Sequence, residues 1–518
     1  TIGVLSIAIS YKIFTSRISS MTNNPLLSWQ ELPTFNAIQP EHFAPAISYV
    51  LNNFNKILHN KVLTETKATW NNTVLPIEAA AEKIDRVWKL ITHLNSVFNT
   101  KEVRAAYEQV LPKITEFNAE IMQNEKLYRV YLKLQQSSEF EHYNPAQKTI
   151  INHAIRNFKL SGVTLPEQER QHFKQLKRRL SALGNQFSKN VLDATQAWEY
   201  QITEENKQLL AGLPEHTVIL AKERALQQQK PGWLLTLDFP CYHAVMSFAK
   251  NSELRKTFYI AYSTRASEQG PNAGNFDNTE IIKEILQLKQ ELAKLLGYKN
   301  YAEYSLVPKM AKTTEQVMNF LTDLTNHSRP FAVKEFAELE QFAKEQGLSE
   351  TLNAWDISYY AELYQQQHYQ LSQESLRPYF PEPQVLSGMF KLVERLFAIK
   401  ITEITNFDKW HDTVKLFAIT DKEGKLRGKF YTDLYTRNFK YGGAWQADLL
   451  SRFRSADNKL QTPVAFLEAN FTPPINGKPA LLSHNEVTTL FHEFGHTLHH
   501  LLTQVDYPSV AGTNGVAW

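Results

Sequence analysis

Three residues within a stretch of five could carry metal chemistry, namely His492, Glu493 and His496. They form H-E-x-x-H, the pattern of a zinc-peptidase helix. Residues four apart on a helix share a face, so both imidazoles can reach one ion at about 2 Å. Glu493 then lies beside the ion, where a carboxylate can take a proton from the zinc-bound water and later give it to a leaving amine. The spacing predicts His492 and His496 as metal ligands and Glu493 as the general base.

The sequence around the motif favours a helix independently of it. Ser483 followed by Glu486 forms a capping box that opens a helix over residues 483–504. Apolar residues recur at helical spacing and form one stripe, with both motif histidines opposite it. The stripe consists of Val487, Leu490, Phe491, Phe494, Leu498, Leu501 and Leu502. We therefore expect one face to pack on a core and the other to face a cleft; a histidine-rich surface helix is the alternative.

A third metal ligand has to come from elsewhere in the chain. The extended pattern H-E-x-x-H-x-x-G-x-x-H fails, because His499 stands at the Gly position and Leu502 at the last His position. The other common third ligand is a Glu on a following helix, but Asp506 is the one carboxylate after Glu493. We expect His499 and His500 to be packing or capping groups, because three ligands on one straight helix cannot converge on one ion.

Composition excludes several classes of protein. A chain of 518 residues is long enough for two lobes. Its formal net charge is +3 with both signs interspersed, which argues against a protein that binds nucleic acid or a membrane surface. The single cysteine, Cys241, excludes an internal disulfide framework, and we expect it to be buried in a protein of the reducing cytoplasm. Residues 1–20 differ in character from the rest of the chain, and we expect them to lie outside the fold.

Sequence patterns predict a mostly α-helical protein with a small β-sheet just before the motif helix. Helical patterns cover most of the chain, including residues 31–158, 166–198, 279–296, 314–345 and 357–370. Strand patterns cover residues 233–239, 414–420, 428–432 and 463–471. A sheet beside the motif helix offers an edge for an extended peptide, although a merely structural sheet is an equal alternative. We divide the chain into an extra segment (1–20), an N-terminal helical region (21–160), a middle helical region (161–340) and a catalytic region (341–518).

Several segments together resemble one family. The helix FHEFGHTLHH, the preceding TDLYTRNFKYGGAW and AFLEANFTPP, and WDISYYAELY with LRPYFP are similar to the thimet oligopeptidase and neurolysin family. The segments LLGYKNYAEYSLVPKMA and NPLLSWQELPTFNAIQPEHF resemble its bacterial oligopeptidase A branch. The resemblance runs in order from about Asn24 to Trp518. It implies a two-lobed helical protein with a deep channel, in which one Zn²⁺ per chain serves to cut short peptides.

The resemblance also assigns residues by matching position. His492 and His496 resemble the family's zinc ligands and Glu493 its general base. Independently of the resemblance, Gly442 and Gly443 form either a loop that approaches substrate closely or an ordinary turn, and Asn470 is a further candidate for substrate binding. The family's third ligand is a Glu about 25 residues beyond the second His, and 22 residues follow His496 here. We therefore expect a monomeric zinc oligopeptidase whose sequence, as given, binds zinc weakly and turns over little or nothing. A catalytically silent helical peptide-binding protein and a helical structural protein with an incidental motif are the alternatives.

Overall fold

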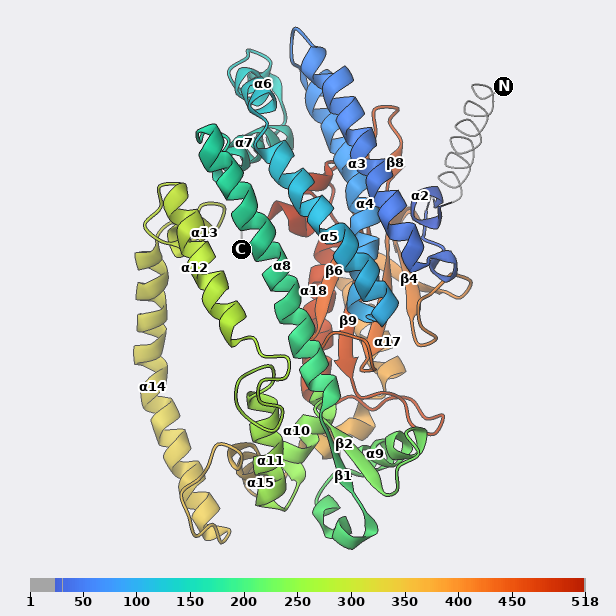
Figure 1. The fold of residues 1–518 in the computed structure, drawn as a ribbon. Coiled ribbons are helices and arrows are strands. Elements are labelled where there is room, and N and C mark those ends of the chain that lie inside the picture. The colour runs from blue at the N-terminus through green and yellow to red at the C-terminus, as the bar shows by residue number, and fades with distance from the viewer. Residues whose placement is uncertain (1–23, 30, 517–518) are drawn as a thin grey trace, which may run out of the picture.

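The computed structural model describes residues 24–29 and 31–516, so the expectations for residues 1–20 and for Trp518 lie outside the described part. Helices form most of the molecule and surround one five-stranded sheet (Figure 1). The prediction of a mostly α-helical protein with a small sheet is confirmed. The domain boundaries stay predictions. In the described part of the chain, none of the helices is long and apolar enough to cross a membrane.

The N-terminal helices pack side by side and cover one face of the sheet (Figure 1). Their amphipathic stripes supply a continuous apolar core that also includes Tyr431 and Phe466 from the strands. The helices are α2 (Pro25–Ser28), α3 (Phe43–Asn60), α4 (Leu75–Val97), α5 (Lys101–Met122), α6 (Glu125–Gln135) and α7 (Pro145–Leu160). The long helix α8 (Glu167–Ala197) packs against α5 and α12. The segment 166–198, whose sequence predicts helix, thus forms one continuous helix from Glu167 to Ala197.

The middle of the chain forms smaller units with cores of their own. Strands β1 (Glu199–Ile202) and β2 (Trp233–Thr236) pair antiparallel. The helices are α9 (Glu215–Gln227), α10 (Phe239–Phe248), α11 (Ser252–Ser263), α12 (Thr279–Leu295), α13 (Tyr301–Leu306), α14 (Thr314–Glu345), α15 (Ile357–Tyr369), α16 (Gln373–Leu376) and α17 (Glu382–Phe397). Cys241 lies in the core around α10, where burial raises the pKa of its thiol to about 12, so it is a packing residue.

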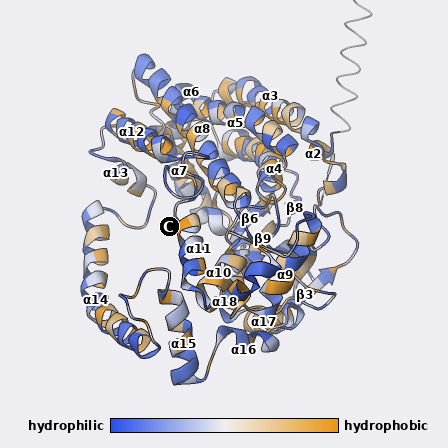
Figure 2. Ribbon diagram, turned by 60° about the horizontal axis from the view of Figure 1, so that its bottom comes forward, coloured by the Kyte–Doolittle hydropathy of each residue, from blue (hydrophilic) through white to orange (hydrophobic). Residues whose placement is uncertain are grey.

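Helix α14 stands at the side of the molecule, and apolar segments alternate with polar ones along it (Figure 2). Most of its length is exposed to solvent, including large apolar side chains. These are Met318, Phe320, Leu321, Leu324, Phe331, Val333 and Phe336. The helix joins the body through its C-terminal turn, where Phe342 and Ala343 pack against α15.

The five-stranded sheet has the order β3-β4-β5-β9-β6, in which β5 and β9 are parallel and the other pairs antiparallel. One face packs on the N-terminal helices and the other on α17 and α18. Burial on both faces explains why the β9 sequence is almost continuously apolar. The strands are β3 (Ile399–Ile404), β4 (Lys415–Asp421), β5 (Leu426–Tyr435), β6 (Trp445–Leu450) and β9 (Val464–Phe471), while β7 (Phe453–Arg454) pairs with β8 (Leu460–Gln461) outside this sheet.

Candidate active site

The motif lies on helix α18 (His484–Leu501), which begins with the predicted capping box. The backbone N–H of Glu486 donates to the Ser483 hydroxyl at 3.1 Å. In return, the N–H of Ser483 donates to the Glu486 carboxylate at 2.7 Å. Two N–H groups that a helix start leaves unpaired are thereby satisfied, and the entry of the chain into α18 is fixed.

Glu486 also ties the start of α18 to the end of strand β9. Its second carboxylate oxygen accepts from the backbone N–H of Thr472 at 3.0 Å, directly after β9. Arg377 donates to Glu486 at 3.1 Å and to the carbonyl of Leu481 at 2.7 Å. Sequence reasoning identified Glu486 only as a cap, because its contacts with Thr472 and Arg377 are made by residues distant in sequence.

The apolar stripe of α18 packs on the sheet much as predicted. Leu490, Phe494, Leu498 and Leu501 are buried in the core shared with α17. The helix approaches the sheet closely at Gly428 of β5, where an added Cβ would lie 2.9 Å from the Leu501 side chain and 2.8 Å from the backbone oxygen of Pro463. The inclusion of Phe491 in the buried stripe was wrong. It lies at the margin of the stripe and is 38% exposed.

The opposite face of α18 carries the motif. The rings of His492 and His496 lie next to each other, with centroids 4.9 Å apart and planes at 83°. His492 is exposed and Glu493 half-buried. His499 is exposed one turn further on. His500, in contrast, is fully buried and contacts the carbonyl oxygen of Leu450 through Nε2 at 2.9 Å, as expected for a packing residue.

Two imidazoles on one helix face provide nitrogen donors of the kind that zinc prefers. A catalytic zinc usually has three protein ligands. Within residues 24–29 and 31–516, however, His, Cys, Asp and Glu side chains form no group of three or more that could hold a metal ion. The donor chemistry of the motif therefore fits a zinc ion, and the described part of the chain brings together two such nitrogen donors.

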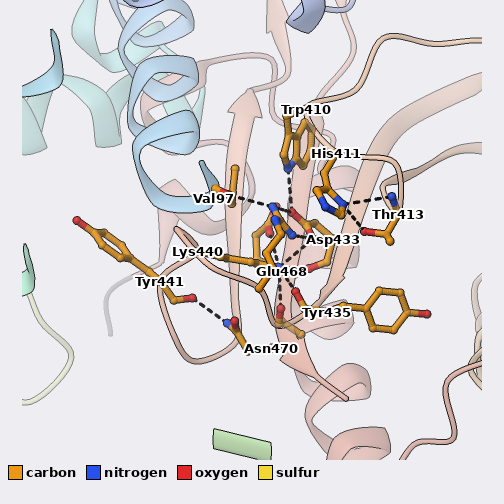
Figure 3. Close-up of polar contacts among 12 residues, drawn as sticks. Val97, Trp410, His411, Thr413, Asp433, Tyr435, Lys440, Tyr441, Glu468 and Asn470 are labelled. Carbon is orange, nitrogen blue, oxygen red and sulfur yellow. Dashed lines mark hydrogen bonds and ion pairs between the residues drawn. The ribbon is translucent and has the colours of Figure 1, made fainter. Parts of the chain in front are cut away.

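The loop with Gly442 and Gly443 leads directly into strand β6, which is the edge strand beside β9. Both glycines are exposed, and Gly443 has φ +100°, a backbone conformation that favours glycine. Asn470 of β9 donates its side-chain amide to the carbonyl of Tyr441 at 2.8 Å (Figure 3). It also donates to the carbonyl of Gly443 at 2.7 Å. The structure thus brings Asn470 and the glycine loop together, and the side-chain amide of Asn470 donates both of these hydrogen bonds to carbonyls of the loop.

Sequence reasoning missed the charged residues behind this loop. Asp433, Lys440 and Glu468 are buried where β5, β9 and the loop meet (Figure 3). A signal was present, since Asp433 and Glu468 interrupt the apolar sequences FYTDLY and AFLEANF. An acidic residue within a strand that is covered on both faces has to be paired or neutral.

A cavity of about 410 Å³ lies between α14 and α15. It is lined by residues that include Lys334, Phe342, Tyr364 and His368. These elements differ from those that carry the motif and the glycine loop. We attach no catalytic role to the cavity.

Comparisons with known proteins agree on one family. The model of peptidase family M3 matches residues 245–518. The model of the neurolysin/thimet oligopeptidase N-terminal domain matches residues 47–170. The chain is similar to oligopeptidase A of Salmonella typhimurium, with 47% identity over 495 residues, and to that of Escherichia coli, with 46%. It is also 36% identical to a probable cytosolic oligopeptidase A of Arabidopsis thaliana. Each alignment covers 96% of this chain and 72% of the relative.

Among solved structures, the chain is similar to PZ peptidase A with inhibitor 2. The TM-score is 0.46 and the sequence identity 14%, over 92% of this chain and 64% of that chain. A putative oligoendopeptidase F gives a TM-score of 0.43 at the same coverage.

Proposed function

The chain belongs to peptidase family M3, a family of metallopeptidases, and from this premise we propose that it has the active-site helix of a zinc-dependent oligopeptidase. Its reaction is hydrolysis of internal bonds in short peptides. The observation that carries the proposal is the capped helix α18, on which His492 and His496 lie side by side with Glu493 between them. We assign the two histidines as zinc ligands and Glu493 as the general base.

Each residue of the motif has a defined chemical task. When bound, zinc polarises the peptide carbonyl and lowers the pKa of water. Neutral imidazoles of His492 and His496 donate nitrogen lone pairs to the ion. The carboxylate of Glu493 accepts the proton of the attacking water and delivers it to the leaving amine. The cap at Ser483 and the buried stripe hold all three side chains on a rigid helix, so little reorganisation is needed.

The zinc affinity of the chain tests the assignment of His492 and His496 as ligands. With two protein ligands we expect one zinc ion per chain at low affinity, measured by competition with a chromophoric chelator. Replacing His492 or His496 by Ala removes half of the donors, so we expect at least a tenfold loss of affinity, in the range seen when zinc sites are perturbed. The control is His499→Ala on the same helix, which should leave affinity unchanged. Equal effects of all three substitutions would refute the assignment.

Turnover tests the role of Glu493. We expect little or no cleavage of a fluorescence-quenched nonapeptide by the chain as given, and loss of any residual cleavage in Glu493→Gln with zinc affinity retained. Stoichiometric zinc together with rapid cleavage would contradict the proposal of an incomplete ligand set. Peptide binding without turnover, unaffected by Glu493→Gln, would favour the alternative of a catalytically silent peptide-binding protein.

Substrate and location follow from the same assignment. We propose short extended peptides as substrates, bound along edge strand β6 with the Gly442-Gly443 backbone nearby. A deep channel between two lobes would restrict entry to such peptides. We propose a monomer in the cytoplasm, where the buried thiol of Cys241 stays reduced.

A further inference from the structure

Lys440 is a buried lysine with every ammonium hydrogen directed at an oxygen atom. Its side chain has no exposed surface. Nζ lies 2.9 Å from Oδ1 of Asp433, 2.6 Å from the Asp433 carbonyl and 2.7 Å from the carbonyl of Ala469 (Figure 3). These three short hydrogen bonds match the three donors of an ammonium group, and the carbonyl of Tyr435 lies further away, at 3.4 Å. A buried charge satisfied in this way fixes the positions of the main-chain segments that it joins.

Asp433 receives donors from the other side as well. Arg437 forms a bidentate pair with its carboxylate at 2.6 Å for each hydrogen bond. Trp410 donates its indole N–H to the same carboxylate at 2.8 Å. Burial opposes ionisation of Asp433, but the positive charges of Lys440 and Arg437 hold its pKa below the ordinary value. Arg437 also donates to the carbonyl of Val97 at 2.9 Å and so reaches helix α4.

Glu468 is the second acid near Lys440. Its carboxylate is fully buried, and one oxygen lies 3.3 Å from Nζ of Lys440. Burial raises the pKa of Glu468 well above its ordinary value. Because Nζ lies 2.9 Å from Asp433 and 3.3 Å from Glu468, Lys440 is paired chiefly with Asp433. The side chains of Lys440 and Asp433 are thus fully buried, and that of Arg437 is 15% exposed.

Hydrogen bonds from two sides, together with Lys440, hold the loop of residues 437–443 in place. The N–H of Tyr441 donates to the carbonyl of Ser96 at 2.8 Å, and the carbonyl of Phe439 accepts from the N–H of Asn99 at 2.7 Å. On the other side lie Lys440 and the two hydrogen bonds from Asn470 of β9. The loop is therefore clamped between the C-terminal end of α4 and strand β9.

The loop continues without interruption into edge strand β6, whose first residue, Trp445, pairs with Glu468. We propose that Lys440 is a positioning residue for peptide binding: it fixes loop 437–443, so that the Gly442-Gly443 backbone and the start of β6 are held ready for an extended peptide. The inference rests on the proposed function, because the loop has a substrate to position only if the protein binds peptides.

Other side chains cannot replace Lys440 in this role. A methionine of similar length would leave the carbonyls of Asp433 and Ala469 without their buried donor. An arginine would present a planar fork to acceptors that converge on one point, which suits an ammonium group. The role therefore requires the compact ammonium.

The test compares Lys440→Met and Asn470→Ala with a matched control in the full chain. The control is Arg255→Met, which breaks another buried pair, formed at 2.6 Å between Arg255 of helix α11 and Asp356 at the start of α15. Hydrogen exchange of the backbone amides of residues 441–450 and the Kd for a fluorescent nonapeptide are measured for each protein. We expect about tenfold faster exchange and about tenfold weaker binding in Lys440→Met, and a smaller change of the same kind in Asn470→Ala.

Arg255→Met should lower the melting temperature but leave both quantities within about twofold of wild type. Should Lys440→Met fail to fold, Asn470→Ala is compared with wild type instead, because it removes only the two hydrogen bonds to the carbonyls of the loop. Unchanged exchange in these variants, or unchanged Kd despite faster exchange, would overturn the inference. If the wild-type chain binds no peptide, the proposed function fails, and the exchange difference alone decides whether Lys440 fixes the loop.

Discussion

The buried imidazole of His93 predicts a specific loss of stability in mild acid. His93 lies on α4, and its ring stacks on Phe466 of β9 with centroids 3.6 Å apart and planes at 6°. Trp410 covers it at 4.3 Å. Its Nε2 finds no hydrogen-bond partner among the residues that the structure describes. Burial lowers the pKa of His93 to about 3, so the native state keeps the ring neutral.

The magnitude follows from the difference between this pKa and the ordinary value of 6.5. Below pH 6.5 the imidazole of His93 binds a proton in the unfolded chain but stays neutral in the native state. The free energy of unfolding therefore falls as the pH is lowered from 6.5 towards 3. Between pH 7 and pH 5 the loss amounts to about 2 kcal/mol, at about 1.36 kcal/mol per pK unit. Above pH 6.5 the effect vanishes.

The assay compares wild type with His93→Phe, which keeps the stacked ring and removes the titrating group. Opening free energies of α4 and β9 from hydrogen exchange, corrected for the intrinsic exchange rate, are measured at pH 7 and pH 5. Wild type should lose about 2 kcal/mol more than the variant. His59→Phe, at an exposed position of α3, is the control and should follow wild type. Parallel losses in wild type and His93→Phe would refute the account of a buried neutral imidazole.

Two further predictions concern the support of the motif helix. Glu486→Ala leaves two backbone N–H groups and an arginine without their acceptor, so we expect the opening free energy of α18, measured by hydrogen exchange, to fall by about 2–3 kcal/mol. The control, Glu335→Ala on the exposed face of α14, should cost less than about 0.5 kcal/mol. Equal costs would contradict the reasoning. Gly428→Ala places a methyl group 2.8–2.9 Å from its neighbours and should cost about 1–3 kcal/mol. Gly184→Ala on helix α8, where an added Cβ meets no atom within 4 Å of the described residues, should instead stabilise by about 0.4–1 kcal/mol in chemical denaturation; a stabilising Gly428→Ala would show that the contact relaxes freely.

Local signals in the sequence were sufficient for the elements that carry the motif. The capping box predicted the start of α18 at Ser483, and the apolar stripe predicted its extent, although the helix ends at Leu501, three residues before the predicted end. The predicted helix over residues 314–345 coincides with α14, because its cap and its ends are also encoded locally. Strand β3 was missed although its sequence IKITEI alternates. Strand β6, WQADLL, was missed because its alternation is weak; what makes it a strand is its pairing with β9, a partner that comes later in the sequence.

The supports of the site depend on contacts between distant segments. The sequence near Lys440 does not indicate that its ammonium group will donate a hydrogen bond to the carbonyl of Ala469, or that α4 will cover the loop. Burial of His93 likewise arises from β9, more than 370 residues further along the chain. Residue types can therefore identify groups able to do chemistry, whereas the residues that hold them in place emerge only from the packing of α4 against the sheet.

His500 couples the motif helix to the edge strand on which we place the peptide. Its ring contacts the carbonyl of Leu450 at the end of β6, while Glu486 fixes the other end of α18 to the end of β9. Strands β6 and β9 are themselves paired. The face with His492 and Glu493 and the edge of β6 are thus parts of one rigid unit. A slip of β6 by one residue would move it by about 3.3 Å and break the contact with His500. A peptide paired with β6, as we propose, would therefore meet the motif in a fixed register, and main-chain pairing would then contribute to the choice of the bond that is cleaved.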